Sequence, residues 1–282
     1  MTRQKTIQTP ITVEGAGIHT GALSIVRLFP AEINSGIVFH FPNHVAVRLV
    51  PESVIGKSRG TSLVWAEGEL KTIEHLLAAL SGCGITNLRI EATGEELPIL
   101  DGSARPWCEQ LMKHAGISEQ TADTSPLTLS APVRIQNESS WIHALPSDRL
   151  HIVCETDYPV LGKQKVEYTS DTDFVRDIAP ARTFGFASEL GALKAGGLAK
   201  GASLENAILI GEDGTFSTPL RFPDEPARHK LLDLLGDLAA LGHPLHAEIH
   251  AHKPGHVINV EWVRAFNALN HERHEKDEAI AF

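Results

Sequence analysis

Two segments in different halves of this chain share the same order of features, and this internal similarity restricts the folds that the chain can adopt. Residues 75–92 read HLLAALSGCGITNLRIEA, and residues 233–250 read DLLGDLAALGHPLHAEIH. Each begins with a helix-forming stretch, passes a glycine (Gly84 or Gly242) and continues with alternating apolar residues. Because alternation with a period of two is typical of a half-buried strand, we expect a helix followed by a strand in both halves.

A second pair of segments supports the same division of the chain. Residues 11–19 (ITVEGAGIH) and 133–143 (VRIQNESSWIH) both alternate and both end in Ile-His. Between the halves, residues 118–132 (SEQTADTSPLTLSAP) are polar and contain a proline, which indicates a linker. The expected fold class is therefore α+β, with a duplicated unit whose two domains span residues 1–124 and 125–282.

Local patterns predict the remaining elements. We expect strands at residues 23–29, 36–41, 45–50, 150–156 and 256–261. We expect helices at residues 71–80, 104–115, 187–195 and 226–242.

Composition and charge exclude several classes of function. Hydrophobic residues make up 42% of the 282 residues and charged residues 21%, which is typical of a globular protein with a core of its own. The formal net charge is −10 and no long basic run occurs, so a DNA or RNA partner is not expected. The three cysteines (Cys83, Cys108 and Cys154) have no CxxC spacing, which argues against a disulfide framework and against a thiolate zinc site.

The sequence contains no pattern of a membrane segment. The first ten residues, MTRQKTIQTP, lack the apolar core of a signal peptide. No stretch approaches the roughly 18 uninterrupted apolar residues of a spanning helix. We therefore expect a cytoplasmic protein without stable insertion into a membrane. We also expect a monomer.

Histidine is unusually frequent, with 15 residues, and the helix expected at residues 226–242 carries one of them beside two acids. His229, Asp233 and Asp237 follow one another at intervals of four residues, so they share one helix face. Gly236 lies between the two acids and leaves room for a close neighbour. A histidine and an aspartate one turn apart can hold the same divalent ion. An isolated HxxxD is nevertheless more often a solvated helix face with a His–Asp pair.

The helix expected at residues 71–80 (KTIEHLLAAL) has Glu74 and His75 in its first turn, with Thr72 as its N-cap. Metal-assisted hydrolysis needs a ligand that fixes the metal and a carboxylate that accepts a proton from water, and this pair supplies both. A glutamate at a helix start is also favoured by the helix dipole, which is the more common explanation for a single pair of this kind.

His256 follows a turn in residues 253–260 (KPGHVINV), where it could face a cleft and act as a cation or an acid. Alone, such a residue is more often an ordinary turn histidine. The pieces predict more in combination, because His75 aligns with Asp233 in the internal repeat. With His229 they make three protein ligands and leave one zinc position free for water, which is the pattern of a catalytic site. Such a site would lie between the two domains, a common location for ligand sites.

These motifs resemble those of the UDP-3-O-acyl-N-acetylglucosamine deacetylases of Gram-negative bacteria, the family that opens lipid A synthesis. The resemblance covers nearly the full length of the chain, and several long motifs in the same order make it specific. The motifs are GAGIHTG (15–21), KTIEHLLAAL (71–80), ELPILDGSA (96–104), ARTFGF (181–186), KGASLENAI (200–208), LRFPDEPARHKLLDLLGDL (220–238) and KPGHVINV (253–260).

The resemblance implies a fold of two similar domains, each with a β-sheet packed on two helices, and an active site between them. It implies Zn²⁺ bound at the positions of His75, His229 and Asp233, although Fe²⁺ would suit the same ligands. It also implies an acylated UDP-amino-sugar as the substrate.

The resemblance further assigns a role to each of several positions. It places the general base at Glu74, and at His256 a cationic histidine that helps the amine to leave and that is supported by the carboxylate of Asp237. It places at Thr183 a hydroxyl that stabilises the developing oxyanion, and at Lys230 a contact to substrate phosphate. Phe184 and Phe186 would border the nucleoside and acyl ends of the cleft.

The segment from Leu190 to Leu209 matches the passage for the fatty acyl chain in that family. Its candidate wall residues are Leu190, Ala199, Ala202, Ser203, Leu204, Ala207 and Leu209. Composition alone would make these apolar residues ordinary core. Ala202 stands where the family usually has glycine, which would narrow the passage and alter the preferred chain length.

Two other functions are compatible with the same residues. A different zinc amidase or peptidase would use the same ligands on another substrate. A non-catalytic module that binds sugar nucleotides would need no metal, but it would have no use for Glu74 beside His75. A comparison of turnover between acylated and non-acylated UDP-sugar distinguishes the deacetylase from the first alternative. The metal content of the purified protein distinguishes it from the second.

Overall fold

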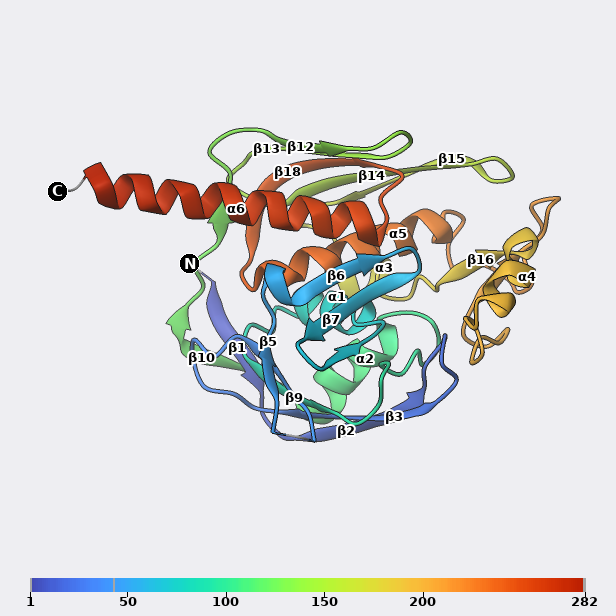
Figure 1. Cartoon of the computed structure of the whole chain (residues 1–282), viewed down its shortest axis with the longest axis horizontal. Coiled ribbons are helices and arrows are strands. Elements are labelled where there is room, and N and C mark those ends of the chain that lie inside the picture. The colour runs from blue at the N-terminus through green and yellow to red at the C-terminus, as the bar shows by residue number, and fades with distance from the viewer. Residues whose placement is uncertain (1, 43, 281–282) are drawn as a thin grey trace.

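A computed structural model describes the backbone of residues 2–42 and 44–280 and the side chains up to residue 270. In Figure 1 two β-sheets form the upper and lower layers of the molecule, and helices lie between them. Buried side chains from both sheets and from these helices form one continuous hydrophobic core.

The lower sheet comes from the first half of the chain and has five strands. Their spatial order is β2 (Ile11–Ala16), β3 (Leu23–Phe29), β9 (Leu88–Ala92), β4 (Ile37–His40) and β5 (Ala46–Arg48). Neighbours are antiparallel, except that β4 and β9 are parallel.

The upper sheet repeats this plan with strands from the second half. Its order is β12 (Val133–Gln136), β13 (Trp141–Pro146), β18 (Leu245–His252), β14 (His151–Tyr158) and β15 (Gly162–Tyr168), with the short β11 (Leu127–Thr128) parallel to β18. Here too one pair on the main path is parallel, β14 with β18. Two sheets with the same order and the same strand directions agree with the expected duplication. The division into domains at residue 124 stays a prediction.

The helices occupy corresponding places in the two halves. Helix α1 (Glu74–Gly82) precedes β9, and α5 (Glu225–Leu238) precedes β18. A second helix follows each of these strands, namely α2 (Arg105–Glu109), which continues as the π-helical turn η2 (Gln110–Ala115), and α6 (His256–Ile280). Gly84 and Gly242 both have φ of 72°, so each ends its helical segment in the left-handed conformation that glycine adopts without strain. The predicted order of helix, glycine and strand is confirmed in both halves.

In each half an insertion separates a sheet strand, β5 or β15, from the central helix that follows it, α1 or α5. The first, after the 3-10 turn η1 (Pro51–Ser53), is a small sheet of β6 (Val54–Lys57), β7 (Gly60–Trp65) and β8 (Gly68–Leu70). The second contains β16 (Phe184–Phe186), α4 (Ala187–Ala195) and β17 (Ile208–Ile210), after the short α3 (Phe174–Asp177). The α4 insertion projects at the right of Figure 1.

Several local predictions are confirmed and others are wrong. Strands lie at β3, β4, β5 and β14, and helices at α2 and α4, where they were expected. Residues 256–261 are not a strand but the start of α6. Their β-branched side chains suggested a strand, yet Ile258, Trp262 and Phe266 are buried at intervals of four residues, which is the spacing of a helix.

The expected linker is also largely structured. Residues Ile117–Asp123 form β10, which pairs with β1 (Arg3–Ile7), and the chain soon reaches β11. The similarity expected between residues 11–19 and 133–143 is limited to their first parts, which form the corresponding strands β2 and β12. Residues 133–143 then continue through a turn into β13.

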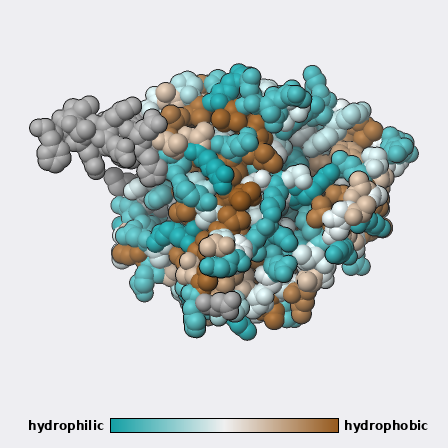
Figure 2. Space-filling model, in the orientation of Figure 1, coloured by the Kyte–Doolittle hydropathy of each residue, from teal (hydrophilic) through white to brown (hydrophobic). Residues whose placement is uncertain are grey.

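Polar and apolar residues alternate over much of the face drawn in Figure 2, and a group of apolar residues lies between the upper sheet and α6. Among the described residues, no helix is both long and apolar enough to cross a membrane.

Candidate active site

The site is built where α1 and α5, the corresponding helices of the two halves, pack against each other. Gly236 makes this close packing possible, because a Cβ at that position would overlap the backbone carbonyl of Glu74. The expectation that Gly236 leaves room for a neighbour is confirmed, and the neighbour is the start of α1. The contact brings His75 on α1 next to His229 and Asp233 on α5.

Three buried side chains converge at this crossing in a way that could hold a metal ion. The candidate ligand atoms of His75, His229 and Asp233 all lie within 4.8 Å of one another. Asp233 Oδ1 is 3.7 Å from His75 Nε2 and 3.4 Å from His229 Nε2. Ligands at about 2.0–2.2 Å from a shared tetrahedral ion are separated by distances of this size.

The two imidazoles are held in the neutral form that binds metals. Burial lowers the pKa of His75 to about 3 and also lowers the pKa of His229. His229 Nδ1 lies 3.0 Å from the carbonyl oxygen of Ala181, so this nitrogen donates its proton there and Nε2 keeps a free lone pair. The carbonyl of Ala181, which the sequence did not single out, thereby orients a candidate ligand.

The hydrogen bonding of Asp233 indicates whether a cation fits between these three side chains. Its Oδ2 accepts a hydrogen bond of 2.6 Å from Lys230 Nζ, but its buried Oδ1 has no hydrogen-bond partner among the described residues. Burial would raise the pKa of Asp233, yet the neighbouring His229 and Lys230 outweigh it and hold the pKa well below its usual range. A buried carboxylate oxygen that faces two neutral imidazoles is a donor set suited to a divalent cation.

Glu74 lies beside this group and is itself buried. Its Oε2 accepts a hydrogen bond of 2.9 Å from the backbone N–H of Thr61 on β7. Burial raises the pKa of Glu74 to about 7, with the nearby Asp233 and Asp237 adding to the effect and His256 opposing it. A carboxylate with a pKa near neutrality can accept and return a proton under physiological conditions.

His256, the first residue of α6, is tied to a buried carboxylate. Its Nδ1 lies 3.1 Å from Asp237 Oδ2, and Asp237 also accepts hydrogen bonds from Thr61 Oγ1 (2.5 Å) and Asn259 Nδ2 (2.8 Å). Burial alone would lower the pKa of His256, but the charges of Asp237 and Asp233 outweigh it and raise the pKa to about 9. His256 is therefore a cation at neutral pH, and its Nε2 faces Asp233 Oδ2 at 3.7 Å.

Thr183 reaches the site from a segment that a buried ion pair fixes. Arg182 Nε donates to Glu225 Oε1 at 2.9 Å, which joins the segment to the start of α5. The N–H of Thr183 also donates to the carbonyl of Gly102 at 2.7 Å. Arg221 bonds Asp101 at 2.9 Å and so connects the same region to the 101–103 loop.

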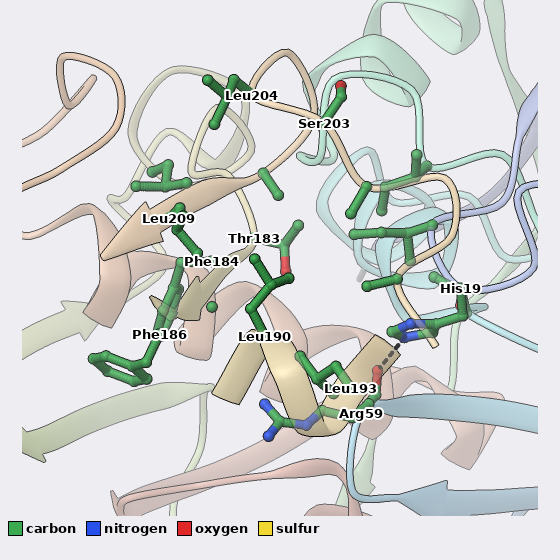
Figure 3. Close-up of a pocket in the computed structure, with 18 of the residues that line it drawn as sticks. His19, Arg59, Thr183, Phe184, Phe186, Leu190, Leu193, Ser203, Leu204 and Leu209 are labelled. Atoms are coloured by element: carbon green, nitrogen blue, oxygen red, sulfur yellow. Dashed lines mark hydrogen bonds between the residues drawn. The ribbon is translucent and has the colours of Figure 1, made fainter. Parts of the chain in front are cut away.

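A cavity of about 290 Å³ opens from this group toward the second insertion (Figure 3). Glu74, His75 and Thr183 line it near the candidate metal group. Most of the predicted substrate residues line the remainder, namely Phe184, Phe186, Leu190, Ala199, Ala202, Ser203, Leu204, Ala207 and Leu209. Figure 3 shows leucine side chains from α4 and from the following loop gathered around this space.

Lys230 is placed differently from these residues. It lies outside the lining of the cavity, bonded to Asp233 and 5.8 Å above the ring of Phe184. Asp233 raises the pKa of Lys230 against the effect of burial, so the amine stays charged next to the candidate metal group.

Sequence reasoning missed several residues of the site. Thr61 and Asn259 bond Asp237, while Ile18, His19 and Arg59 line the cavity. Thr61 and Arg59 have no local signature, because only the folded chain brings the first insertion to α1 and α6. His19 stands in GAGIHTG, a motif noted for resemblance only. Thr72 was expected to be an N-cap, but the residue before α1 is Ile73 and the helix start has no side-chain cap.

A buried group that could hold a metal, beside a carboxylate and a cationic histidine and at one end of an apolar cavity, is typical of an enzyme that hydrolyses amides or esters. The sequence model of the family described as UDP-3-O-acyl N-acetylglycosamine deacetylase matches residues 4–268. The chain therefore belongs to this family, and it is a hydrolytic deacetylase.

Individual relatives agree with the family match. The chain is 38% identical over 264 residues to the UDP-3-O-acyl-N-acetylglucosamine deacetylase of Leptospira biflexa, covering 91% of this chain and 87% of that one. It is 36% identical over 278 residues to the protein of the same name from Trichormus variabilis, with coverage of 95% and 99%. For that of Syntrophotalea carbinolica the identity is 39% over 271 residues, with coverage of 93% and 87%.

The close packing at Gly236 yields a first prediction about stability. Alanine usually favours a helix over glycine by about 1 kcal/mol, but here the added Cβ must displace the start of α1. Gly236→Ala should lower the free energy of unfolding by about 1–3 kcal/mol, as overpacking does. Denaturant unfolding measures this, with Gly191→Ala in α4 as the control because a Cβ there meets no neighbour. Unchanged stability in Gly236→Ala would contradict the packing described.

Proposed function

We propose that this enzyme removes the N-acetyl group from UDP-3-O-acyl-N-acetylglucosamine, giving acetate and the free amine, as a step of lipid A synthesis. The observation that carries the proposal is the cavity itself. One end of it is lined by Glu74 and His75, and the other end by aliphatic side chains that suit a fatty acyl chain. The relatives bear the name of a deacetylase of this substrate.

We propose Zn²⁺ as the metal, because two neutral imidazoles and one carboxylate with a free position are the ligand set of catalytic zinc. His75, His229 and Asp233 would hold it. A zinc ion bound there would supply Lewis-acid chemistry, polarising the acetamide carbonyl and lowering the pKa of a water. Fe²⁺ would suit the same ligands.

Glu74 is the group of this chain that accepts the proton of the attacking water. Water adds to the carbonyl carbon of the acetamide, and one of its protons moves to a carboxylate oxygen of Glu74. The hydrogen bond from the N–H of Thr61 leaves the second carboxylate oxygen available for this transfer. The Thr183 hydroxyl would donate a hydrogen bond to the developing oxyanion, and one preorganised donor of this kind lowers the activation free energy by about 3–4 kcal/mol.

His256 completes the reaction at the nitrogen. As an imidazolium bonded to Asp237 through Nδ1, it donates the proton on Nε2 to the departing amine while the carbon–nitrogen bond breaks. The Asp237 carboxylate stabilises the cationic ring through this hydrogen bond. Lys230 is proposed to contact substrate phosphate, and Phe184 and Phe186 to border the cleft.

The affinity for the substrate would come largely from its acyl chain. Each buried methylene contributes about 0.8 kcal/mol, so a chain of ten or more carbons can dominate binding. The segment Leu190–Leu209 supplies the aliphatic wall, and Ala202 would narrow it.

The direct test compares the acylated UDP-sugar with UDP-N-acetylglucosamine, which lacks the chain. We expect kcat/KM to be higher for the acylated substrate by at least about 10³-fold, because several methylenes are buried. Similar turnover of both, or faster hydrolysis of an unrelated amide, would instead favour a different amidase or peptidase.

The dependence of activity on pH should be bell-shaped. Glu74 must be ionised, and its raised pKa of about 7 makes activity rise with pH up to that value. A divalent cation beside Glu74 favours the ionised form, so this limb lies at or below about pH 7. His256 must be protonated, so activity falls as pH rises through its pKa, which is about 9 without the metal and which a cation bound at Asp233 would lower.

The upper limb can be assigned with one substitution. Asp237→Asn removes the charge that raises the pKa of His256, so burial dominates and the upper limb should move to lower pH. An upper limb that stays at the wild-type pH in this variant would show that another group is responsible for it.

A further inference from the structure

Glu96 is a buried carboxylate that the reaction described above does not use. Only 1% of its surface is exposed, and it follows β9 as the first residue of the ELPILDGSA motif. Four hydrogen bonds converge on it, from the backbone N–H groups of His19 and Thr20 (2.9 and 2.7 Å) and from the hydroxyls of Thr20 and Thr72 (2.7 and 2.9 Å). Burial would raise the pKa of Glu96, but these bonds outweigh it and keep the carboxylate charged.

One side of this cluster leads to the candidate base. Thr72 has φ of 58°, a left-handed conformation that is strained for a β-branched residue. Two residues later α1 begins with Glu74 and His75. The hydrogen bond from the Thr72 hydroxyl to Glu96 offsets part of this strain and fixes the direction in which the chain enters α1.

The other side leads to the wall of the apolar cavity. Glu96 holds the turn between β2 and β3, and that turn accepts hydrogen bonds from the next segment of the wall. The N–H of Lys200 donates to the carbonyl of His19 at 3.2 Å, and the N–H of Gly201 donates to that of Ile18 at 3.0 Å. Ala199 and Ala202, on either side of this pair, line the cavity.

Two glycines show how tightly these parts are fitted. A Cβ at Gly17 would overlap the carboxylate of Glu96, and a Cβ at Gly201 would overlap the carbonyl of Gly17. The motifs GAGIHTG, ELPILDGSA and KGASLENAI therefore meet at one point, although they are far apart in the sequence.

We propose that Glu96 is a positioning residue that holds the entry of α1 and the cavity wall in one fixed relation, so that the rate advantage of an acylated substrate depends on it. Binding energy from a remote part of a substrate accelerates a reaction only when a rigid structure transmits it to the reacting groups. The path runs from the acyl chain through residues 199–202 and the turn at residues 17–20 to Glu96, and from there through Thr72 to Glu74. The inference rests on the proposed substrate.

The test is Glu96→Gln, which keeps the shape of the side chain but replaces one accepting oxygen with an amide nitrogen, from which the backbone N–H groups of His19 and Thr20 cannot accept a hydrogen bond. Glu95→Gln is the matched control, since the Glu95 side chain is 82% exposed and pairs only loosely with Lys71 at 3.8 Å. For each protein kcat and KM are measured with the acylated UDP-sugar and with UDP-N-acetylglucosamine, together with the metal content and the thermal midpoint. The deciding quantity is the ratio of the two kcat/KM values.

We expect this ratio to fall by about tenfold or more in Glu96→Gln, the equivalent of one lost hydrogen bond to a charged group, and to stay unchanged in Glu95→Gln. A purely structural role would reduce the amount of folded enzyme, which lowers both rates alike and leaves the ratio as it was. A ratio within about twofold of the wild-type value would overturn the proposal.

If Glu96→Gln does not fold, Thr72→Val decides the question. Thr72→Val replaces the hydroxyl with a methyl group and should lower the ratio of the two kcat/KM values. Thr72→Ser keeps the hydroxyl and its hydrogen bond, so it should keep the wild-type ratio. An unchanged ratio in Thr72→Val would overturn the proposal. Failure of the proposed function has a different signature, because the wild-type enzyme itself would then show no preference for the acylated substrate.

Discussion

Replacing Glu74 with glutamine should lower kcat by about 10²- to 10⁴-fold, the usual contribution of a general base, while the metal stays bound. Glutamine has the shape of glutamate but cannot accept the proton of the attacking water. KM should change little, because Glu74 is proposed to act on the water and not on the acyl chain. Steady-state kinetics and metal analysis of the same preparation measure both effects.

The control for this variant is Glu95→Gln, an exposed position that lies away from the cavity and should keep full activity. Loss of the metal from Glu74→Gln would show that Glu74 is a ligand, and the assignment of the base would then be wrong. Retention of more than about a tenth of the activity would also contradict a role as the general base.

His229→Ala should abolish both metal binding and activity. It removes one of the three candidate ligands from a buried position, and only His75 and Asp233 would remain. We expect less than about one tenth of an equivalent of metal and a kcat lower by at least about 10³-fold, since both metal-derived effects are lost together.

A metal ion bound only by the folded state would also stabilise the fold. Zinc at 100 times its dissociation constant should stabilise the wild-type protein by about 2.7 kcal/mol, and a chelator should reverse this. His229→Ala should show neither change. His250→Ala, on the outer face of the upper sheet and bonded to Glu248, is the matched control and should behave as the wild type does. Full metal content in His229→Ala would exclude this residue as a ligand.

Much of the fold can be predicted from the sequence, because the duplication is recorded in local patterns. The helix, glycine and strand order recurs in both halves, and the two glycines adopt the same backbone conformation. The spacing of four between His229 and Asp233 likewise fixes their common helix face. His75 joins them because α1 and α5 are corresponding helices that pack directly against each other.

The parts that the sequence does not predict depend on contacts between distant residues. Residues 256–261 have the β-branched composition of a strand, and only burial of Trp262 and Phe266 against the core makes them helical. The support of His256 by Asp237 was expected from the resemblance alone. No local sequence pattern predicts the hydrogen bonds that Asp237 accepts from Thr61 and Asn259. The strain at Thr72 is equally invisible before the chain is folded.

We propose that the two imidazoles and the carboxylate at the crossing of α1 and α5 share one cation. Anomalous scattering from a crystal of the active, zinc-loaded enzyme, recorded on both sides of the zinc edge, tests it most directly. We predict a single strong peak about 2.0–2.2 Å from Nε2 of His75, Nε2 of His229 and a carboxylate oxygen of Asp233. A fully active crystal whose zinc peak lies elsewhere, or touches only one of these three side chains, would exclude a shared zinc site at this crossing.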